Sequence, residues 1–110
     1  LTCPARIPCP CPKMDWTQTM SWDMQSIDIE RFPALSLGWE VAERGGTCGA
    51  VVNAANEAAV DLFLERKISF GDIEKSVAFA MNKFAHLPGN SLIEIFTTDK
   101  VVKNYIYNNV

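Results

Sequence analysis

The single histidine is the first residue to test for chemistry. His86 stands beside Pro88 and Gly89, with no carboxylate or thiol close to it in the sequence. A histidine that acts as a general base must reach the proton it removes and is held in place by a partner. The sequence therefore favours a solvated loop histidine at this position.

Three carboxylates share one face of a predicted helix. Glu57, Asp61 and Glu65 recur at i, i+4 and i+8, which brings them to one side of a helix of 3.6 residues per turn. The apolar residues of the same segment lie on the opposite side. This arrangement favours a solvated acidic surface.

Two asparagines are unusual for their position in an alanine-rich helix. Asn53 and Asn56 fall in its first turns, although asparagine is a poor helix former. A buried amide without a partner costs about 1 to 3 kcal/mol. Two interpretations are open: the amides cap or cross-link neighbouring segments, which we favour, or they contact a substrate.

The four cysteines leave several possibilities. Cys3, Cys9, Cys11 and Cys48 could form two disulfides, but the rest of the chain has enough helical periodicity to fold without them. Cys9-Pro10-Cys11 is too tight for an easy mutual bridge. Its spacing from Cys3 matches no common zinc knuckle. Free thiols are the favoured interpretation, and we expect no metal site.

A glycine-rich turn could bind an anion. Gly45-Gly46-Thr47-Cys48-Gly49 precedes a predicted helix, whose N-terminal N–H groups attract negative charge. The turn lacks the lysine and the spacing of a phosphate-binding loop. A plain helix-to-helix turn is therefore favoured.

Helical periodicity organises the chain after residue 30. Pro33 is expected at the first helical position, and Ala34, Leu37, Gly38, Val41 and Ala42 form an apolar stripe that ends at Gly45-Gly46. A second helix is expected from about Cys48 to Arg66. A third follows the possible cap Ser69, with Asp72 completing a capping box. Ser91 and Glu94 open a fourth helix that reaches Tyr107 and could break at Thr97-Thr98-Asp99.

The first 29 residues have a different pattern. Four of the six prolines lie between residues 1 and 12, which predicts an extended connector. From Met14 to Met24 apolar and polar residues alternate, which is typical of a half-buried strand or of two short strands broken near Gln18. A lone strand is unstable. Because no other segment predicts a strand, we expect its partner outside these 110 residues.

Composition excludes several classes of protein. Hydrophobic residues make up 48% of the chain and charged residues 21%, as in ordinary globular proteins. The net charge of -3 gives no attraction for nucleic acid or an anionic membrane surface. No apolar run is long enough to span a bilayer. We expect a soluble, mainly α protein with residues 1–29 as a linker and residues 30–110 as a small antiparallel four-helix bundle.

Several motifs resemble the C-terminal part of the 1-deoxy-D-xylulose 5-phosphate reductoisomerase family. They are Arg31-Phe32-Pro33-Ala34-Leu35, Gly45-Gly46-Thr47, Val52-Asn53-Ala54-Ala55-Asn56-Glu57, Ile68-Ser69-Phe70 with Asp72-Ile73, and Ser91-Leu92 with Glu94-Ile95. Pro4 and Arg6-Ile7-Pro8 resemble the approach to the family's linker. The order and spacing match along essentially the whole chain.

The resemblance implies an enzyme of isoprenoid biosynthesis by the non-mevalonate route. Members isomerise and reduce deoxyxylulose phosphate to 2-C-methyl-D-erythritol 4-phosphate, with NADPH and a Mg or Mn ion. It also implies an upstream NADPH domain, an upstream catalytic domain and a homodimeric parent in the bacterial cytoplasm or plastid stroma. This chain would be the end of the catalytic domain, the linker and the helical bundle.

The resemblance places no catalytic residue or metal ligand in this chain. Leu1 alone corresponds to a position near the nicotinamide in some members, and we expect the chain by itself to bind no cofactor and to be inactive. Six residues form a structural signature: Pro33, Gly45, Gly46, Asn53, Asn56 and Glu57. The alternative is a stand-alone helical interaction module that docks a partner on its Trp/Met strand.

Overall fold

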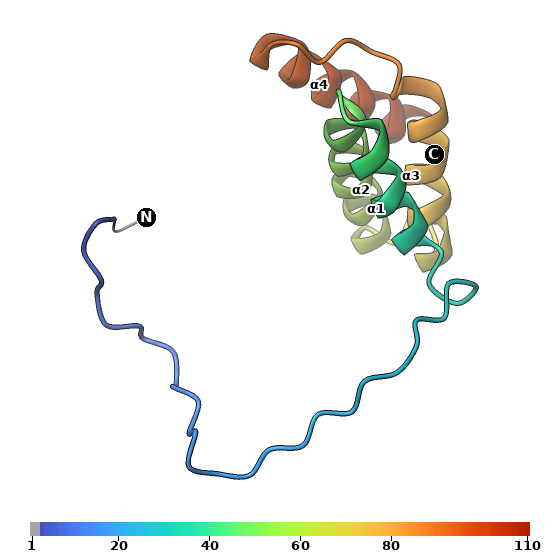
Figure 1. Ribbon diagram of the computed structural model, residues 1–110. Helices are drawn as coiled ribbons and strands as arrows, with labels where there is room; N and C mark the ends of the chain where they lie inside the picture. Colours follow the sequence, from blue (N-terminus) through green and yellow to red (C-terminus); the bar gives the residue numbers. More distant parts are fainter. Residues whose placement is uncertain (1–2) are drawn as a thin grey trace.

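Four helices in one bundle make up the folded part of the molecule (Figure 1). The computed structural model describes residues 3–110, and its helices are α1 (Ala34–Arg44), α2 (Cys48–Leu64), α3 (Phe70–Phe84) and α4 (Leu92–Asn109). Short turns join them. The predicted mainly helical, four-helix architecture is confirmed.

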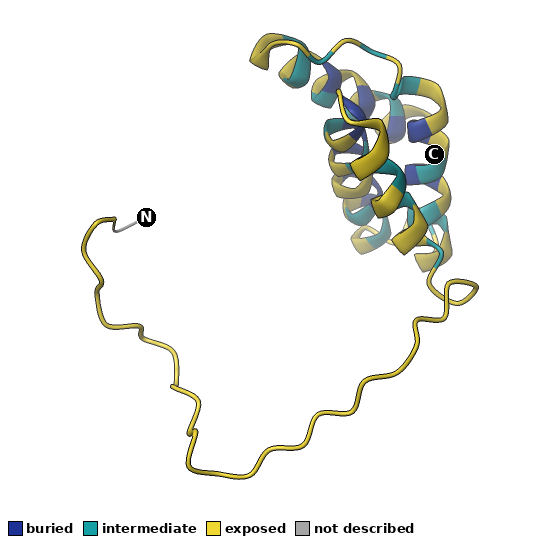
Figure 2. Ribbon diagram, viewed as in Figure 1, coloured by how far each residue is buried: buried dark blue, intermediate teal, exposed yellow. Residues whose placement is uncertain are grey.

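Helix α2 is the centre of the bundle and packs chiefly against α3 and α4. Its inner face is fully buried and carries mostly alanines, which lets both neighbouring helices approach closely (Figure 2). From the other helices, Val77 and Ala80 of α3 and Val102 and Ile106 of α4 complete the core. The core residues of α2 are Val51, Ala54, Ala55, Ala58, Ala59 and Leu62.

Helix α1 lies at the edge of the bundle and has no buried residue. Of its predicted apolar stripe, Leu37 and Val41 are half-buried, while Ala34, Gly38 and Ala42 are exposed. A groove of about 460 Å³ separates α1 from parts of α2 and α3. The predicted stripe is therefore only partly covered, because α1 contacts the core mainly through Leu37.

Two loops meet at one end of the bundle. The hydroxyl of Thr47, in the α1–α2 turn, is fully buried and donates to the Leu87 carbonyl at 2.7 Å. A Cβ on Gly89 would lie 2.8 Å from the Thr47 backbone nitrogen. Gly45 and Gly46 both have positive φ, at 63° and 56°, so the turn needs glycine at these positions.

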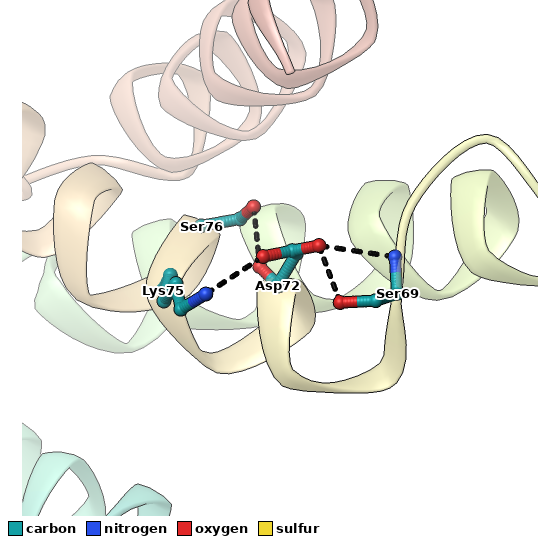
Figure 3. A network of polar contacts seen from close by, with 4 residues as sticks. All are labelled: Ser69, Asp72, Lys75 and Ser76. Atoms are coloured by element: carbon teal, nitrogen blue, oxygen red, sulfur yellow. Dashed lines mark hydrogen bonds and ion pairs between the residues drawn. The ribbon is translucent and has the colours of Figure 1, made fainter.

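The two predicted capping boxes are confirmed. Figure 3 shows the first, in which the Asp72 carboxylate accepts hydrogen bonds from the Ser69 backbone N–H (3.0 Å) and the Ser69 hydroxyl. These bonds hold the pKa of Asp72 at about 2, mainly through the Ser69 hydroxyl. In the second, the Glu94 carboxylate accepts from the Ser91 N–H at 3.0 Å.

Three boundary predictions need correction. Helix α1 begins at Ala34, with Pro33 as its N-cap rather than its first residue. Helix α2 ends at Leu64 rather than near Arg66, because Arg66 adopts a positive φ of 61° that a right-handed helix does not accept. Helix α4 is unbroken, although Thr98 or Asp99 was expected to cap a new segment. Thr98 is buried instead, and the Asp99 carboxylate lies 3.1 Å from Lys103 Nζ.

The predicted strand between Met14 and Met24 is absent from the described chain. The segment is an extended arm exposed along its whole length (Figures 1 and 2). Asp15 starts a local turn in which its carboxylate accepts from the Thr17 N–H at 3.0 Å. The arm has no neighbouring strand within residues 3–110 with which to form a ladder, so alternation alone does not produce a strand here.

Candidate functional site

The most organised cluster of polar side chains in the described part of the chain lies between α2 and α4. We call it the polar seam. Its central residue is Glu57, one of the six signature residues. The seam consists of Asn53, Glu57 and Asp61 from α2, with Asp99, Lys103 and Tyr107 from α4.

Glu57 connects the two helices. Its Oε2 lies 2.6 Å from Lys103 Nζ, and its Oε1 accepts from Asn53 Nδ2 at 3.0 Å. Lys103 Nζ also lies 3.1 Å from Asp99 Oδ1. The hydrogen bond from Lys103, and then that from Asn53, lowers the pKa of Glu57, while the bonds to Glu57 and Asp99 raise the pKa of Lys103.

A second cross-link follows one turn later. Tyr107 donates its phenolic proton to Asp61 Oδ2 at 2.6 Å, and this bond is the main reason that the pKa of Tyr107 is raised. Glu57 pairs with Lys103 and Asp61 pairs with Tyr107. The second pair lies four residues, or about one turn, further along both helices than the first. Along this contact, α2 and α4 therefore advance in the same general direction.

The seam is suited to holding helices together rather than to proton transfer. A lowered pKa keeps the Glu57 carboxylate ionised at neutral pH, and raised pKa values keep Lys103 and Tyr107 protonated. A general acid or base works best with a pKa near the working pH. All three shifts move away from neutrality.

The carboxylate row proved more structured than the sequence suggested. Glu57, Asp61 and Glu65 are exposed, as predicted. Each nevertheless has a partner, which for Glu65 is Lys67 at 2.7 Å. Helical spacing located the row, but the partners on α4 could not be identified without knowing how α4 lies on α2.

Asn53 and Asn56 line the groove beside α1. Both are exposed, so neither carries the cost of a buried unpaired amide. Asn53 bonds to Glu57 within its own helix. A structural role for these two asparagines remains a prediction.

Other candidate residues are dispersed. His86 is exposed in the α3–α4 loop, and Pro33 and the glycine pair lie at the two ends of α1. All four cysteines are free: Cys48 is buried, which raises its pKa, and the other three lie along the exposed arm. Residues 3–110 contain no group of three or more His, Cys, Asp or Glu side chains able to hold a metal ion. Leu1 lies outside the described residues.

Sequence reasoning missed the contact between Thr47 and the Leu87 carbonyl. The only available signal was a threonine directly after the glycine pair, which equally suits a helix cap.

No helix among the described residues is long and apolar enough to cross a membrane.

The fold and its side chains thus define a small helical domain whose polar residues bind one another. Comparison with known families gives a specific match: residues 1–105 fit the model of the DXP reductoisomerase C-terminal domain. The chain belongs to this family.

Individual relatives agree with the family match. A 1-deoxy-D-xylulose 5-phosphate reductoisomerase of Chloroherpeton thalassium is 35% identical over 98% of this chain and 28% of its own length. That of Zymomonas mobilis is 40% identical over 90% of the chain and 26% of its own length. That of Rhodopirellula baltica is 61% identical over 66% of the chain and 16% of its own length. No solved structure matches the chain.

These relatives are much longer than the chain. The 110 residues span about a quarter of the Chloroherpeton and Zymomonas proteins, and a smaller share of the Rhodopirellula protein is aligned.

Proposed function

We propose that this chain is the C-terminal structural domain of an NADPH-dependent 1-deoxy-D-xylulose 5-phosphate reductoisomerase. The match of residues 1–105 to the family's C-terminal domain carries the proposal. The parent enzyme would isomerise and reduce its substrate in non-mevalonate isoprenoid biosynthesis, as a homodimer.

The parent's metal ion and NADPH belong to upstream domains in this proposal. The described residues do not fit a divalent metal, because no three His, Cys, Asp or Glu side chains among them come together as ligands. The carboxylates of the polar seam are moreover bound to Lys103 and Tyr107. In this proposal no catalytic step falls within residues 3–110. Its role is to support the domains that carry the chemistry.

The arm would attach the bundle to the catalytic domain. Trp16 and Trp22 are 82% and 68% exposed, and Met24 is also exposed. Large aromatic and methionine side chains gain roughly 1.5 to 3 kcal/mol each on full burial, so their exposure favours a partner. In the parent we expect residues 14–24 to add a strand to a sheet edge of the catalytic domain.

A domain exchange tests the proposal. The C-terminal quarter of the Chloroherpeton thalassium relative is replaced by residues 1–110, and NADPH oxidation is measured with deoxyxylulose phosphate and Mn. We expect the chimera to turn over and the same relative truncated before this quarter to lose most of its activity. A folded but inactive chimera, or full activity in the truncated protein, would argue against the assignment.

The second candidate, a stand-alone interaction module, is favoured only by the same exposed Trp/Met arm. It predicts that residues 1–110 bind a partner without restoring any reductoisomerase. The chimera experiment separates the two candidates, because an interaction module has no reason to support turnover in the exchanged enzyme.

A further inference from the structure

The beginning of α4 is apolar on more than one side. Ile95 is half-buried and Thr98 buried on the side that faces the bundle. On the outer side, Leu92, Ile93 and Phe96 are 72%, 78% and 65% exposed. Large apolar side chains that gather on an exposed surface normally mark a contact site. The bundle covers only one side of these two turns.

A groove continues this exposed surface. It has a volume of about 550 Å³ and runs between the end of α3, the α3–α4 loop and the first turns of α4. Most of its lining is apolar, with Lys83 and Glu94 among the polar residues. We call the groove and the exposed turns the α4 face, defined by Leu87, Pro88, Leu92, Ile93, Phe96 and Val101.

We propose that the α4 face is a second docking surface for the upstream part of the same polypeptide, separate from the arm. This inference rests on the proposed function. An apolar centre with a few charged residues among its neighbours is the composition of protein interfaces.

The tether favours the upstream part over a second copy of the chain. The relatives extend to about three and a half times the length of this chain, so a large upstream portion would be joined to the arm. A flexible tether holds two modules at an effective concentration of about millimolar, which exceeds the usual concentration of a free second copy. The tethered upstream part is therefore expected to cover the α4 face in preference to a second copy of the chain.

The arm is long enough for this arrangement. The stretch from residue 3 to residue 30 can span about 90 Å when extended. An 18-residue helix such as α4 is about 27 Å long. The arm joins the start of α1, at the end of the bundle away from the start of α4 (Figure 1). The upstream part can nevertheless reach the α4 face, because the arm is longer than the bundle.

Thiol labelling tests this docking. Cys3, Cys9 and Cys11 are changed to serine, and one reporter is introduced, either Ile93→Cys in the α4 face or Asn104→Cys further along the same helix. Each variant is made in residues 1–110 alone and in the Chloroherpeton chimera. A maleimide probe then measures the rate at which each introduced thiol reacts.

We expect the Ile93→Cys thiol to react at least about tenfold more slowly in the chimera than in the isolated chain, and the Asn104→Cys thiol to change less than about twofold. Equal rates at position 93 in an active chimera would overturn the docking surface and leave the proposed function intact. Equal slowing at both positions would contradict a surface confined to the α4 face. Protection in the isolated chain that grows with its concentration would assign the face to a second copy instead.

An inactive chimera would count against the proposed function. A separate labelling experiment tests whether the arm attaches to the upstream part. A Trp16→Cys variant in the same background shows whether the arm is covered. Slow labelling at position 93 with fast labelling at position 16 would support the α4 face while contradicting attachment through the arm.

Discussion

The exposed carboxylate of Asp72 takes part in several local bonds. It accepts from Ser69 and lies 2.9 Å from Lys75 Nζ (Figure 3). Because its folded pKa of about 2 lies below the ordinary aspartate value of 3.8, the ionised form stabilises the fold. This contribution is fully present above about pH 4 and is lost as the pH falls through about 2.

The neutral variant Asp72→Asn tests this pH dependence. Thermal unfolding of both proteins, followed by circular dichroism, should show a lower melting temperature for the variant at pH 6. The difference should shrink towards pH 2, where the native carboxyl also becomes neutral. A difference that stays constant between pH 6 and pH 2 would show that the charge is not the cause.

The buried hydroxyl of Thr47 gives a second prediction at this scale. Thr47→Val keeps the side-chain shape but leaves the Leu87 carbonyl without its donor. We expect a loss of about 1 to 3 kcal/mol in the free energy of unfolding, measured with urea. Thr97→Val is the matched control, because the exposed Thr97 hydroxyl bonds only to its own helix, and it should change stability much less. Equal losses would show that the contact with the Leu87 carbonyl contributes no more than a hydroxyl bond within one helix.

At the scale of elements, the two loops at one end of the bundle fix each other. A Cβ at position 89 would lie 2.8 Å from the Thr47 nitrogen and 2.9 Å from the Gly46 carbonyl carbon. Both neighbours are backbone atoms, so the loops would have to separate. Gly89→Ala should cost about 1 to 3 kcal/mol of unfolding free energy.

Gly71→Ala is the control for that substitution. Nothing lies within 4 Å of a Cβ at position 71, which is in the first turn of α3. Alanine is the better helix former, so stability should stay level or rise slightly. If Gly89→Ala unfolds at the same urea concentration as Gly71→Ala, the close approach of the loops is wrong.

The success of sequence reasoning depended on how local each signal is. The capping boxes at Ser69 and Ser91 and the stop at Gly45-Gly46 are set by residues a few positions apart, and they were predicted correctly. The Thr97 break and the strand at Met14 failed. For the strand, the deciding partner would be a neighbouring strand, which is not local. For α4, a new cap and a continuous helix are both local patterns, and Thr98 is buried in the bundle rather than free to cap a new segment.

The candidate site divides in the same way. Helical spacing found Glu57 as part of an exposed row, but the pairing with Lys103 depends on how two helices distant in sequence pack. The alanine-rich sequence of α2 does not say which helices pack on it, and the structure shows that these are chiefly α3 and α4. The periodicity of the sequence identifies which face of a helix is apolar or charged. Which helix contacts that face is known only from the packing.

For the whole molecule, the central claim is that the bundle supports chemistry carried out elsewhere in the polypeptide. The polar side chains of the seam bind one another, and the apolar arm and the α4 face are left uncovered within residues 3–110. This combination is expected of a domain taken from a larger assembly.

The most direct measurement is NADPH oxidation by purified residues 1–110 with deoxyxylulose phosphate and Mn, with the Chloroherpeton chimera assayed beside it. Circular dichroism first establishes that the chain is helical under the assay conditions. We predict turnover by the chimera and none by residues 1–110 alone. Turnover by the isolated chain would contradict the account, because it would place catalytic groups within these 110 residues.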